Sequence, residues 1–264
     1  MKVFIITDLE GATGVSGSWE DFNPGGRIHE EAKRMLTSDV NAAVEGLFRG
    51  GATEIVVLDG HGAAFSILLE DLDPRVKLIR GKRLSELEGL DSSFDAVVVI
   101  GAHAMAGTPS ALLCHTLSHE TIVNIWLNGE LVGEIGLWAA IAGYYNVPII
   151  MVVGDYAATE EAKKLLGDIE VVAVKRATSM YAAECVHPSV ARKLIASAAE
   201  RSLIRLRRGE FKPLKLEPPV ELKVEYMLPI HAERIALRSR VVRVDGRTVL
   251  YRGENILECM RAIL

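Results

Sequence analysis

The chain has 264 residues, of which 49% are hydrophobic and 25% are charged, and its formal net charge is −5. This length allows a large buried core, the composition is that of a soluble globular protein, and the acidic balance argues against general nucleic-acid binding. The three widely spaced cysteines argue against a disulfide framework, and no apolar stretch suits a membrane span or a signal peptide, so we expect a cytoplasmic protein.

The chain opens on an unbroken apolar run, Val3–Ile6, which continues into two carboxylates, Asp8 and Glu10. A short continuous run of this kind predicts a strand that is buried on both faces of a sheet. Because strand side chains alternate, Asp8 and Glu10 should project to the same side where the strand ends. Adjacent buried anions need a cation that neutralises them, although a single acid at a strand end can simply cap a turn.

A glycine-rich connection follows Glu10 and should line the same end of the sheet as Asp8 and Glu10. Helical and strand patterns alternate after it. His29–Arg49 has the pattern of an amphipathic helix, which Gly50-Gly51 can end. Three further apolar runs predict buried strands at Glu54–Leu58, Ala96–Ile100 and Pro148–Val153. Strands separated by helices indicate a three-layer α/β fold with a mostly parallel sheet, in which ligands bind beyond the carboxyl ends of the strands.

An insertion with its own pattern lies between the third and fourth predicted strands. Leu112–Ser118 reads as an extended segment, and Ile122–Leu127 as a strand that enters a hairpin turn at Asn128-Gly129. Ile135–Tyr144 is apolar almost all round, which predicts a buried helix opened by Glu134. A polar helix and one more strand are predicted after the fourth strand, at Thr159–Leu166 and Val171–Lys175.

The pattern changes near residue 187 to that of a smaller α+β lobe. This part begins with a predicted helix, Pro188–Arg207, and a linker over residues 213–219. A strand at Val220–Met227, a hairpin around Asp245-Gly246 and a short C-terminal helix follow. We therefore expect an α/β metal-binding catalytic region over residues 1–186 and an α+β lobe over residues 187–264, which either packs on the first region or completes its sheet.

Histidines follow two of the predicted strands. His61 and His103 stand between small residues, which let backbone and ligand approach closely. One such histidine is usually an ordinary core or loop residue, but two that converge on Asp8 and Glu10 favour a metal site. Glu134 could complement the dipole of its helix or supply another carboxylate. Two histidines and three carboxylates suit two ions about 3.5–4 Å apart, with Asp8 shared between them.

Short motifs in a fixed order give a further indication over the first two thirds of the chain. They are Asp8-Leu9-Glu10-Gly11, Asp59-Gly60-His61-Gly62, Gly101-Ala102-His103-Ala104, Gly107-Thr108-Pro109, Cys114-His115-Thr116, Gly133-Glu134-Ile135-Gly136-Leu137, Ala142-Gly143-Tyr144-Tyr145-Asn146-Val147-Pro148 and Gly154-Asp155. As a set they resemble the zinc-dependent D-aminopeptidases of the DppA type, whereas the last third of the chain matches only loosely.

The resemblance implies a metallo-aminopeptidase that removes the N-terminal residue of short peptides or aminoacyl amides, with the preference for D or L residues left open. It implies two Zn²⁺ per subunit and His115 as the catalytic residue beside the metals. The family also implies a ring-shaped homodecamer that encloses a chamber, so that only small peptides reach the sites. The implied metal ligands are Asp8, Glu10, His61, His103 and Glu134.

Several roles near the site stay open. His115 and His119 share one side of the predicted extended segment, so either could act, and the resemblance favours His115. Cys114 stands where a smaller residue is expected, so its reactivity or metal contact is undecided. Asp155 could hold the substrate ammonium, although a capping role suits a strand end better. Either a water activated at the site or His115 itself would attack the carbonyl, and His115 would also move a proton to the leaving amine.

Two other functions compete with peptide hydrolysis. The first is a dinuclear metallophosphoesterase, whose ligands at strand ends superficially resemble Asp59-Gly60-His61 and Gly101-Ala102-His103. That class has Asp-x-His where this chain has Asp8-Leu9-Glu10. The second is a non-catalytic peptide-binding ring in which a metal only holds the fold.

Overall fold

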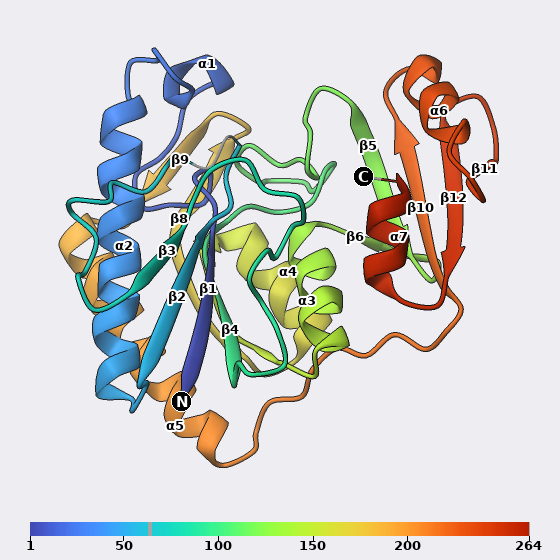
Figure 1. Cartoon of the computed structure of the whole chain (residues 1–264). Helices are drawn as coiled ribbons and strands as arrows, with labels where there is room; N and C mark the ends of the chain where they lie inside the picture. The colour runs from blue at the N-terminus through green and yellow to red at the C-terminus, as the bar shows by residue number, and fades with distance from the viewer. Residues whose placement is uncertain (63–64, 264) are drawn as a thin grey trace.

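The main body of the protein is a seven-stranded sheet, and the computed structural model describes residues 1–62 and 65–263 (Figure 1). In spatial order its strands are β3 (Lys77–Ile79), β2 (Glu54–Asp59), β1 (Lys2–Thr7), β4 (Ala96–Ala102), β7 (Ile149–Asp155), β8 (Glu170–Ser179) and β9 (Ala182–Cys185). Neighbouring strands are parallel, except that β8 and β9 are antiparallel. The predicted mostly parallel α/β sheet is therefore confirmed, and β4 is its middle strand.

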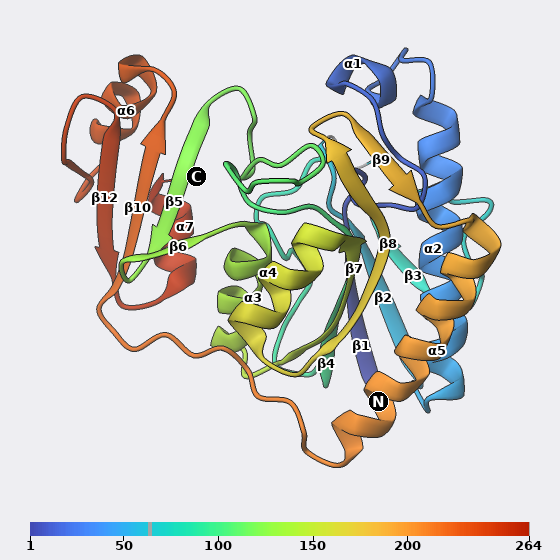
Figure 2. The same cartoon turned by 180° about the vertical axis from the view of Figure 1, so that it is seen from behind.

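Helices cover both faces of this sheet, which makes the predicted three layers (Figures 1 and 2). Helices α2 (His29–Arg49) and α5 (Pro188–Arg207) pack on one face, and α3 (Glu134–Tyr144) and α4 (Tyr156–Leu166) on the other. Within the described residues, no helix has both the length and the apolar character that a membrane crossing requires.

Strand β1 shows why the opening apolar run is unbroken. Val3 and Ile5 belong to the core beneath α2 and α5, whereas Phe4 and Ile6 belong to the core on the opposite face. All four side chains are buried, because both faces of the strand are covered. The run therefore ends at the carboxyl edge of the sheet, where Asp8 begins a turn.

Two predicted chain reversals depend on backbone conformations that favour glycine or asparagine. Helix α2 ends at Gly50, and Gly51 then takes a φ of 99°. In the hairpin between β5 (Ile122–Leu127) and β6 (Glu130–Val132), Asn128 has a φ of 47° and Gly129 a φ of 88°. Both residues are thus in the left-handed region that a two-residue hairpin turn requires.

A second, antiparallel sheet lies beside the main body, in the order β11-β12-β10-β5-β6. Its last two strands precede residue 187 in the chain, and α5, which follows residue 187, packs on the main sheet. The boundary between residues 186 and 187 stays a prediction. The second sheet takes strands from both sides of it, whereas the strands of the main sheet all precede it. The remaining elements of this part are β10 (Val220–Tyr226), β11 (Val242–Arg243), β12 (Thr248–Gly253), α6 (Pro229–Ala236) and α7 (Ile256–Ile263).

One predicted segment is wrong. Residues 112–118 form an irregular loop and no strand, because Leu113 and Leu117 adopt φ angles of 51° and 62° that turn the chain. The pattern also gave no indication of β3, β9, α6 or the short helix α1 (Trp19–Phe22). The loop of residues 112–118 carries His115, and α1 carries Trp19.

Candidate metal centre

Three neighbouring strands bring acidic and imidazole groups to one edge of the main sheet. Asp8 follows β1, His61 follows β2 and His103 follows β4, and these strands lie side by side. The side chains of Asp8 and His103 are buried, and that of His61 is 18% exposed. The prediction that they meet at the carboxyl ends of the strands therefore agrees with the structure.

The carboxylate of Asp8 lies between the two histidines. Its Oδ1 is 3.1 Å from Nδ1 of His61, and its Oδ2 is 3.1 Å from Nε2 of His103. The backbone N–H of Leu9 donates to Oδ1 at 2.9 Å and helps to fix this orientation. Each oxygen of one carboxylate thus faces a different imidazole, which is the arrangement that a ligand shared by two ions needs.

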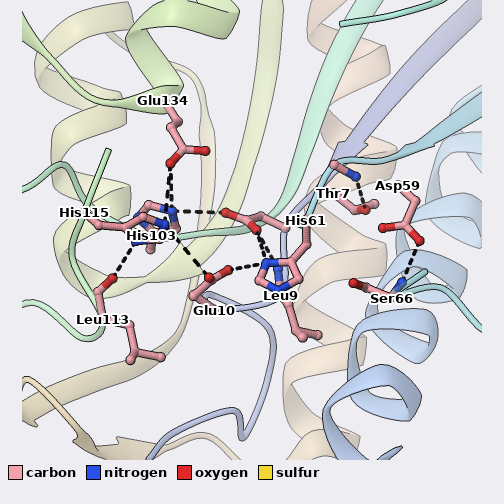
Figure 3. Close-up of polar contacts among 12 residues, drawn as sticks. Thr7, Leu9, Glu10, Asp59, His61, Ser66, His103, Leu113, His115 and Glu134 are labelled. Carbon is pink, nitrogen blue, oxygen red and sulfur yellow. Dashed lines mark hydrogen bonds and ion pairs between the residues drawn. The ribbon is translucent and has the colours of Figure 1, made fainter. Parts of the chain in front are cut away.

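Two glutamates each approach one of these histidines, as Figure 3 shows for Glu10 beside His61 and Glu134 beside His103. Oε2 of Glu10 lies 2.9 Å from Nδ1 of His61, and Oε1 of Glu134 lies 3.2 Å from Nε2 of His103. Glu134 is the first residue of α3, and its Oε1 also accepts a hydrogen bond from the backbone N–H of Leu117 at 2.7 Å. The five predicted ligands therefore form one cluster with two halves.

His115 lies beside this cluster and stacks on His103, with ring centroids 3.9 Å apart. Nδ1 of His115 lies 2.9 Å from the carbonyl oxygen of Leu113, to which it can donate, so that Nε2 is left to face the acids. This Nε2 lies 4.0 Å from Oε1 of Glu10 and 3.8 Å from Oε1 of Glu134. His115 is thus close enough to exchange protons with a substrate bound in the cluster.

His119 packs against Trp19. Its ring stacks on Trp19 with centroids 4.1 Å apart, and Trp19 in turn meets the ring of His115 edge-on at 5.0 Å. Trp19 belongs to α1, which the sequence pattern did not indicate. Trp19 and His119 therefore pack against the ring of His115, and of these two histidines it is His115 whose Nε2 lies within 4.0 Å of Glu10 and Glu134.

The other two residues with open roles make structural contacts. The thiol of Cys114 lies 3.7 Å from the carbonyl oxygen of Thr108. The carboxylate of Asp155 accepts hydrogen bonds from the backbone N–H groups of Ala157 and Ala158 and so caps α4. The capping role expected for Asp155 agrees with this geometry.

Charges within the cluster lower the pKa of Asp8 and raise the pKa values of His61 and His103. Burial alone would raise the pKa of Asp8, but the adjacent imidazoles of His103 and His61 outweigh it and hold that pKa well below its ordinary value. Burial likewise opposes the charged form of both histidines, yet Glu134 and Asp8 raise the pKa of His103, and Glu10 and Asp8 raise that of His61, well above the ordinary value. The cluster therefore holds positive charge strongly.

The cluster also leaves two buried atoms without a hydrogen bond within the described part of the chain. They are Oε2 of Glu10 and Nε2 of His103, although each lies within ion-pair distance of an oppositely charged group. Buried polar atoms normally have a partner, and a divalent cation would supply one to both. Ligand atoms of Asp8, Glu10 and His103 lie within 4.8 Å of one another, as do those of His103, His115 and Glu134. These residue types and spacings fit zinc.

A buried lysine that we did not predict as part of the site holds the loop that carries Glu10. Nζ of Lys175 donates to the backbone carbonyl oxygens of Glu10, Ala12 and Val15 at 2.5, 2.8 and 2.6 Å. Burial lowers the pKa of Lys175 to about 8. The one signal in the sequence is a lysine at the end of the apolar run that predicts β8. Lys175 thus stabilises the position of Glu10 from β8, three strands away from β1.

Replacing Lys175 with methionine should destabilise the metal-free protein. The change leaves three buried carbonyl oxygens without their donor, and each such loss costs about 1 kcal/mol or more, so we expect the free energy of unfolding to fall by about 3 kcal/mol. Urea unfolding followed by circular dichroism measures this. Lys193→Met, on the exposed surface of α5, is the matched control. An unchanged midpoint for Lys175→Met would show that Lys175 does not stabilise this loop.

The whole chain matches a known protein family. The model of peptidase M55, described as D-aminopeptidase, matches residues 1–264. This chain belongs to the M55 D-aminopeptidase family. A D-aminopeptidase of Bacillus subtilis (strain 168) is 32% identical to this M55 chain over 273 residues, which cover 100% of the chain and 96% of that relative.

A solved structure of the M55 family is also similar. The Zn-dependent D-aminopeptidase DppA from Bacillus subtilis, described as a self-compartmentalizing protease, superposes with a TM-score of 0.94 at 31% identity. The match covers 99% of this chain and 95% of that one, so it includes the last third, which the sequence motifs matched only loosely. The predicted resemblance is therefore confirmed over the full length. Membership of the M55 family places the chain among metallopeptidases rather than phosphoesterases.

Proposed function

We propose that this M55 protein is an aminopeptidase that uses two zinc ions to remove the N-terminal residue of short peptides, with a preference for D residues. The observation that supports it best is the position of Asp8, whose two oxygens face His61 and His103 on opposite sides. Glu10 and Glu134 each add a carboxylate to one of these halves. The five residues would hold the two ions, with Asp8 shared.

The protein's own groups would then bind and orient the peptide. Bound zinc would supply Lewis acidity toward the scissile carbonyl and lower the pKa of a nearby water. His115, whose Nε2 lies 4.0 Å from Glu10 and 3.8 Å from Glu134, would take a proton from the attacking water and deliver it to the leaving amine. Trp19 and His119 would keep the ring of His115 in place by packing behind it.

The assembly and location belong to the same proposal. DppA is described as self-compartmentalizing, and we propose for this chain a ring-shaped homodecamer whose chamber admits only short peptides. We place it in the cytoplasm and propose neither a nucleic-acid partner nor a membrane partner. The formal charge of −5 supports the first of these points.

A panel of D- and L-aminoacyl amides tests the proposed activity. Purified protein with two zinc ions per subunit should hydrolyse the D substrates, should lose activity after chelation, and should recover it when zinc is returned. A preference for L substrates would contradict only the proposed D specificity and would leave the aminopeptidase activity standing. Hydrolysis of a phosphate ester without hydrolysis of any amide would favour a phosphoesterase, and peptide binding without turnover would favour a non-catalytic ring.

A further inference from the structure

A large cavity adjoins the metal centre on the side of His61. Its volume is about 940 Å³, and it lies between the loop after β3, helix α3 and the C-terminal helix α7. Figure 1 shows these three segments side by side, and α3 packs directly against α7. The apolar part of its wall comprises Phe65, Leu84, Leu87, Ile141, Tyr145, Leu257 and Met260.

The cavity begins next to the metal ligands and extends away from them along α3. Gly62, which follows His61 directly, lines one end of it. Ile141 lines it further along α3, seven residues after Glu134 at the start of that helix. Seven residues of α-helix span about 10 Å, so Ile141 lies about that far along α3 from Glu134.

Basic side chains dominate the polar part of the lining: Lys82, Arg83, Arg238 and Arg261. None of them forms an ion pair with a carboxylate in the part of the chain that the structure describes. Arg83, Arg238 and Arg261 donate only to backbone carbonyl oxygens, those of Asp59, Ala262 and Leu257. The cavity lining therefore carries more basic than acidic groups among the described residues.

One acid shares this lining. Glu86 is half-buried, and burial first and then the charge of Glu134 raise its pKa. Four basic groups against one glutamate leave the cavity cationic even when Glu86 is ionised. Apolar side chains beside several basic groups suit an anion on a small, largely apolar molecule, because charge-assisted hydrogen bonds can hold the anion while the apolar side chains contact the rest of the molecule.

We propose that this cavity binds the free C-terminal carboxylate of a short peptide whose N-terminal residue lies at the metal centre. The proposal rests on the proposed aminopeptidase function and adds a substrate class to it: unblocked oligopeptides. An extended peptide advances about 3.3–3.6 Å per residue, so the span of about 10 Å corresponds to roughly three residues. The lining thus selects short peptides by their charge as well as by their length.

Paired substrates test this assignment in the intact, zinc-loaded protein. The first is a tripeptide with a free carboxylate, the second is the same tripeptide as its C-terminal amide, and the third is an amidated tripeptide that ends in glutamate. We expect the free acid to have a kcat/KM about tenfold or more above that of the neutral amide, mainly through KM. If the glutamate amide equals the free acid, the cavity recognises any carboxylate at that distance. If only the free acid is favoured, it recognises the terminus itself.

Charge-removing variants connect the preference to the cavity. Lys82→Met and the double variant Arg238→Gln/Arg261→Gln change exposed side chains and should bring the free acid down to the level of the amide. Arg247→Gln, which changes an arginine paired with Glu225 outside the cavity, is the matched control and should keep the preference. A preference that persists in both cavity variants, or equal rates for acid and amide in the parent, would overturn the proposal.

A simple aminoacyl amide separates this proposal from the proposed function. It reaches the metals but is too short to enter the cavity, so its hydrolysis should be unchanged in every variant. If the parent hydrolyses aminoacyl amides but makes no distinction between peptide acid and peptide amide, only the carboxylate subsite is wrong. If it hydrolyses none of these substrates, the aminopeptidase function itself is wrong.

Discussion

An Asp8→Asn variant is expected to bind no zinc tightly and to lose at least about a thousandfold in kcat/KM, since the ions supply several kcal/mol of transition-state stabilisation. The reason is geometric. Oδ1 of Asp8 lies next to His61 and Oδ2 lies next to His103, so one substitution weakens both halves of the site. Metal analysis of the dialysed protein, together with hydrolysis of D-aminoacyl amides, measures the two effects.

Substitution of either glutamate alone should remove only one of the two ions. Glu10→Gln should lose the ion on the side of His61 and keep the other, and Glu134→Gln should do the reverse. Each variant should therefore retain about one zinc per subunit, as expected for a pair of ions that share one carboxylate. Loss of both ions from either variant, or of only one from Asp8→Asn, would contradict the role of Asp8 as the shared ligand.

The matched control is the same substitution at the opposite end of β1. The exposed Asp95 accepts a hydrogen bond from the backbone N–H of Lys2 at 2.7 Å, far from the cluster along the strand. Asp95→Asn should keep both zinc ions and the parent activity. A loss of zinc in this variant would show that the effect of Asp8→Asn arises from a general loss of structure.

A His115→Ala variant is expected to keep both zinc ions and to lose about 10²–10⁴-fold in kcat, the range for removal of a general acid or base. His119→Ala is the control: the His119 ring stacks on Trp19 and forms no ion pair with Asp8, Glu10 or Glu134 among the described residues, so the loss in kcat should stay below about tenfold. Parent activity in fully loaded His115→Ala would refute the catalytic assignment. Retention of only one zinc would show that His115 is a ligand, as its proximity to His103 and Glu134 allows.

The pH profile gives a second measure of His115. Burial first, and then the positive charge of His103, lower the pKa of His115 from its ordinary value of 6.5, and bound cations would act in the same direction. The neutral ring is the base, so kcat/KM should fall as the pH drops through this lowered pKa, which places the acid limb below pH 6.5. This limb should disappear from the residual activity of His115→Ala. An acid limb above pH 6.5 in the parent would contradict the assignment.

The sequence predicted the parts of the fold that depend on local pattern. Unbroken apolar runs predicted the buried parallel strands, and the residues after them, Asp8, His61 and His103, lie together because parallel strands end at one edge. The prediction that Glu134 is a metal ligand depended more on the family resemblance, because a glutamate at the start of a helix can simply complement the helix dipole.

What the sequence did not predict depends on contacts between distant segments. Lys175 lies 165 residues from Glu10 in the chain, so no local pattern shows that it binds the loop next to the site. The loop of residues 112–118 turns at Leu113 and Leu117, whose positive φ angles are unusual for leucine and are set by the surrounding structure. The cationic cavity likewise joins residues from five parts of the chain, near positions 62–65, 82–87, 141–145, 238 and 257–261.

The most direct test of the central claim is a crystal structure of the zinc-loaded protein with anomalous diffraction at the zinc absorption edge. The account predicts two peaks per subunit, about 3.5–4 Å apart, on opposite sides of the Asp8 carboxylate, with His61 and Glu10 at one and His103 and Glu134 at the other. A single peak, or two peaks that do not share Asp8, would contradict it.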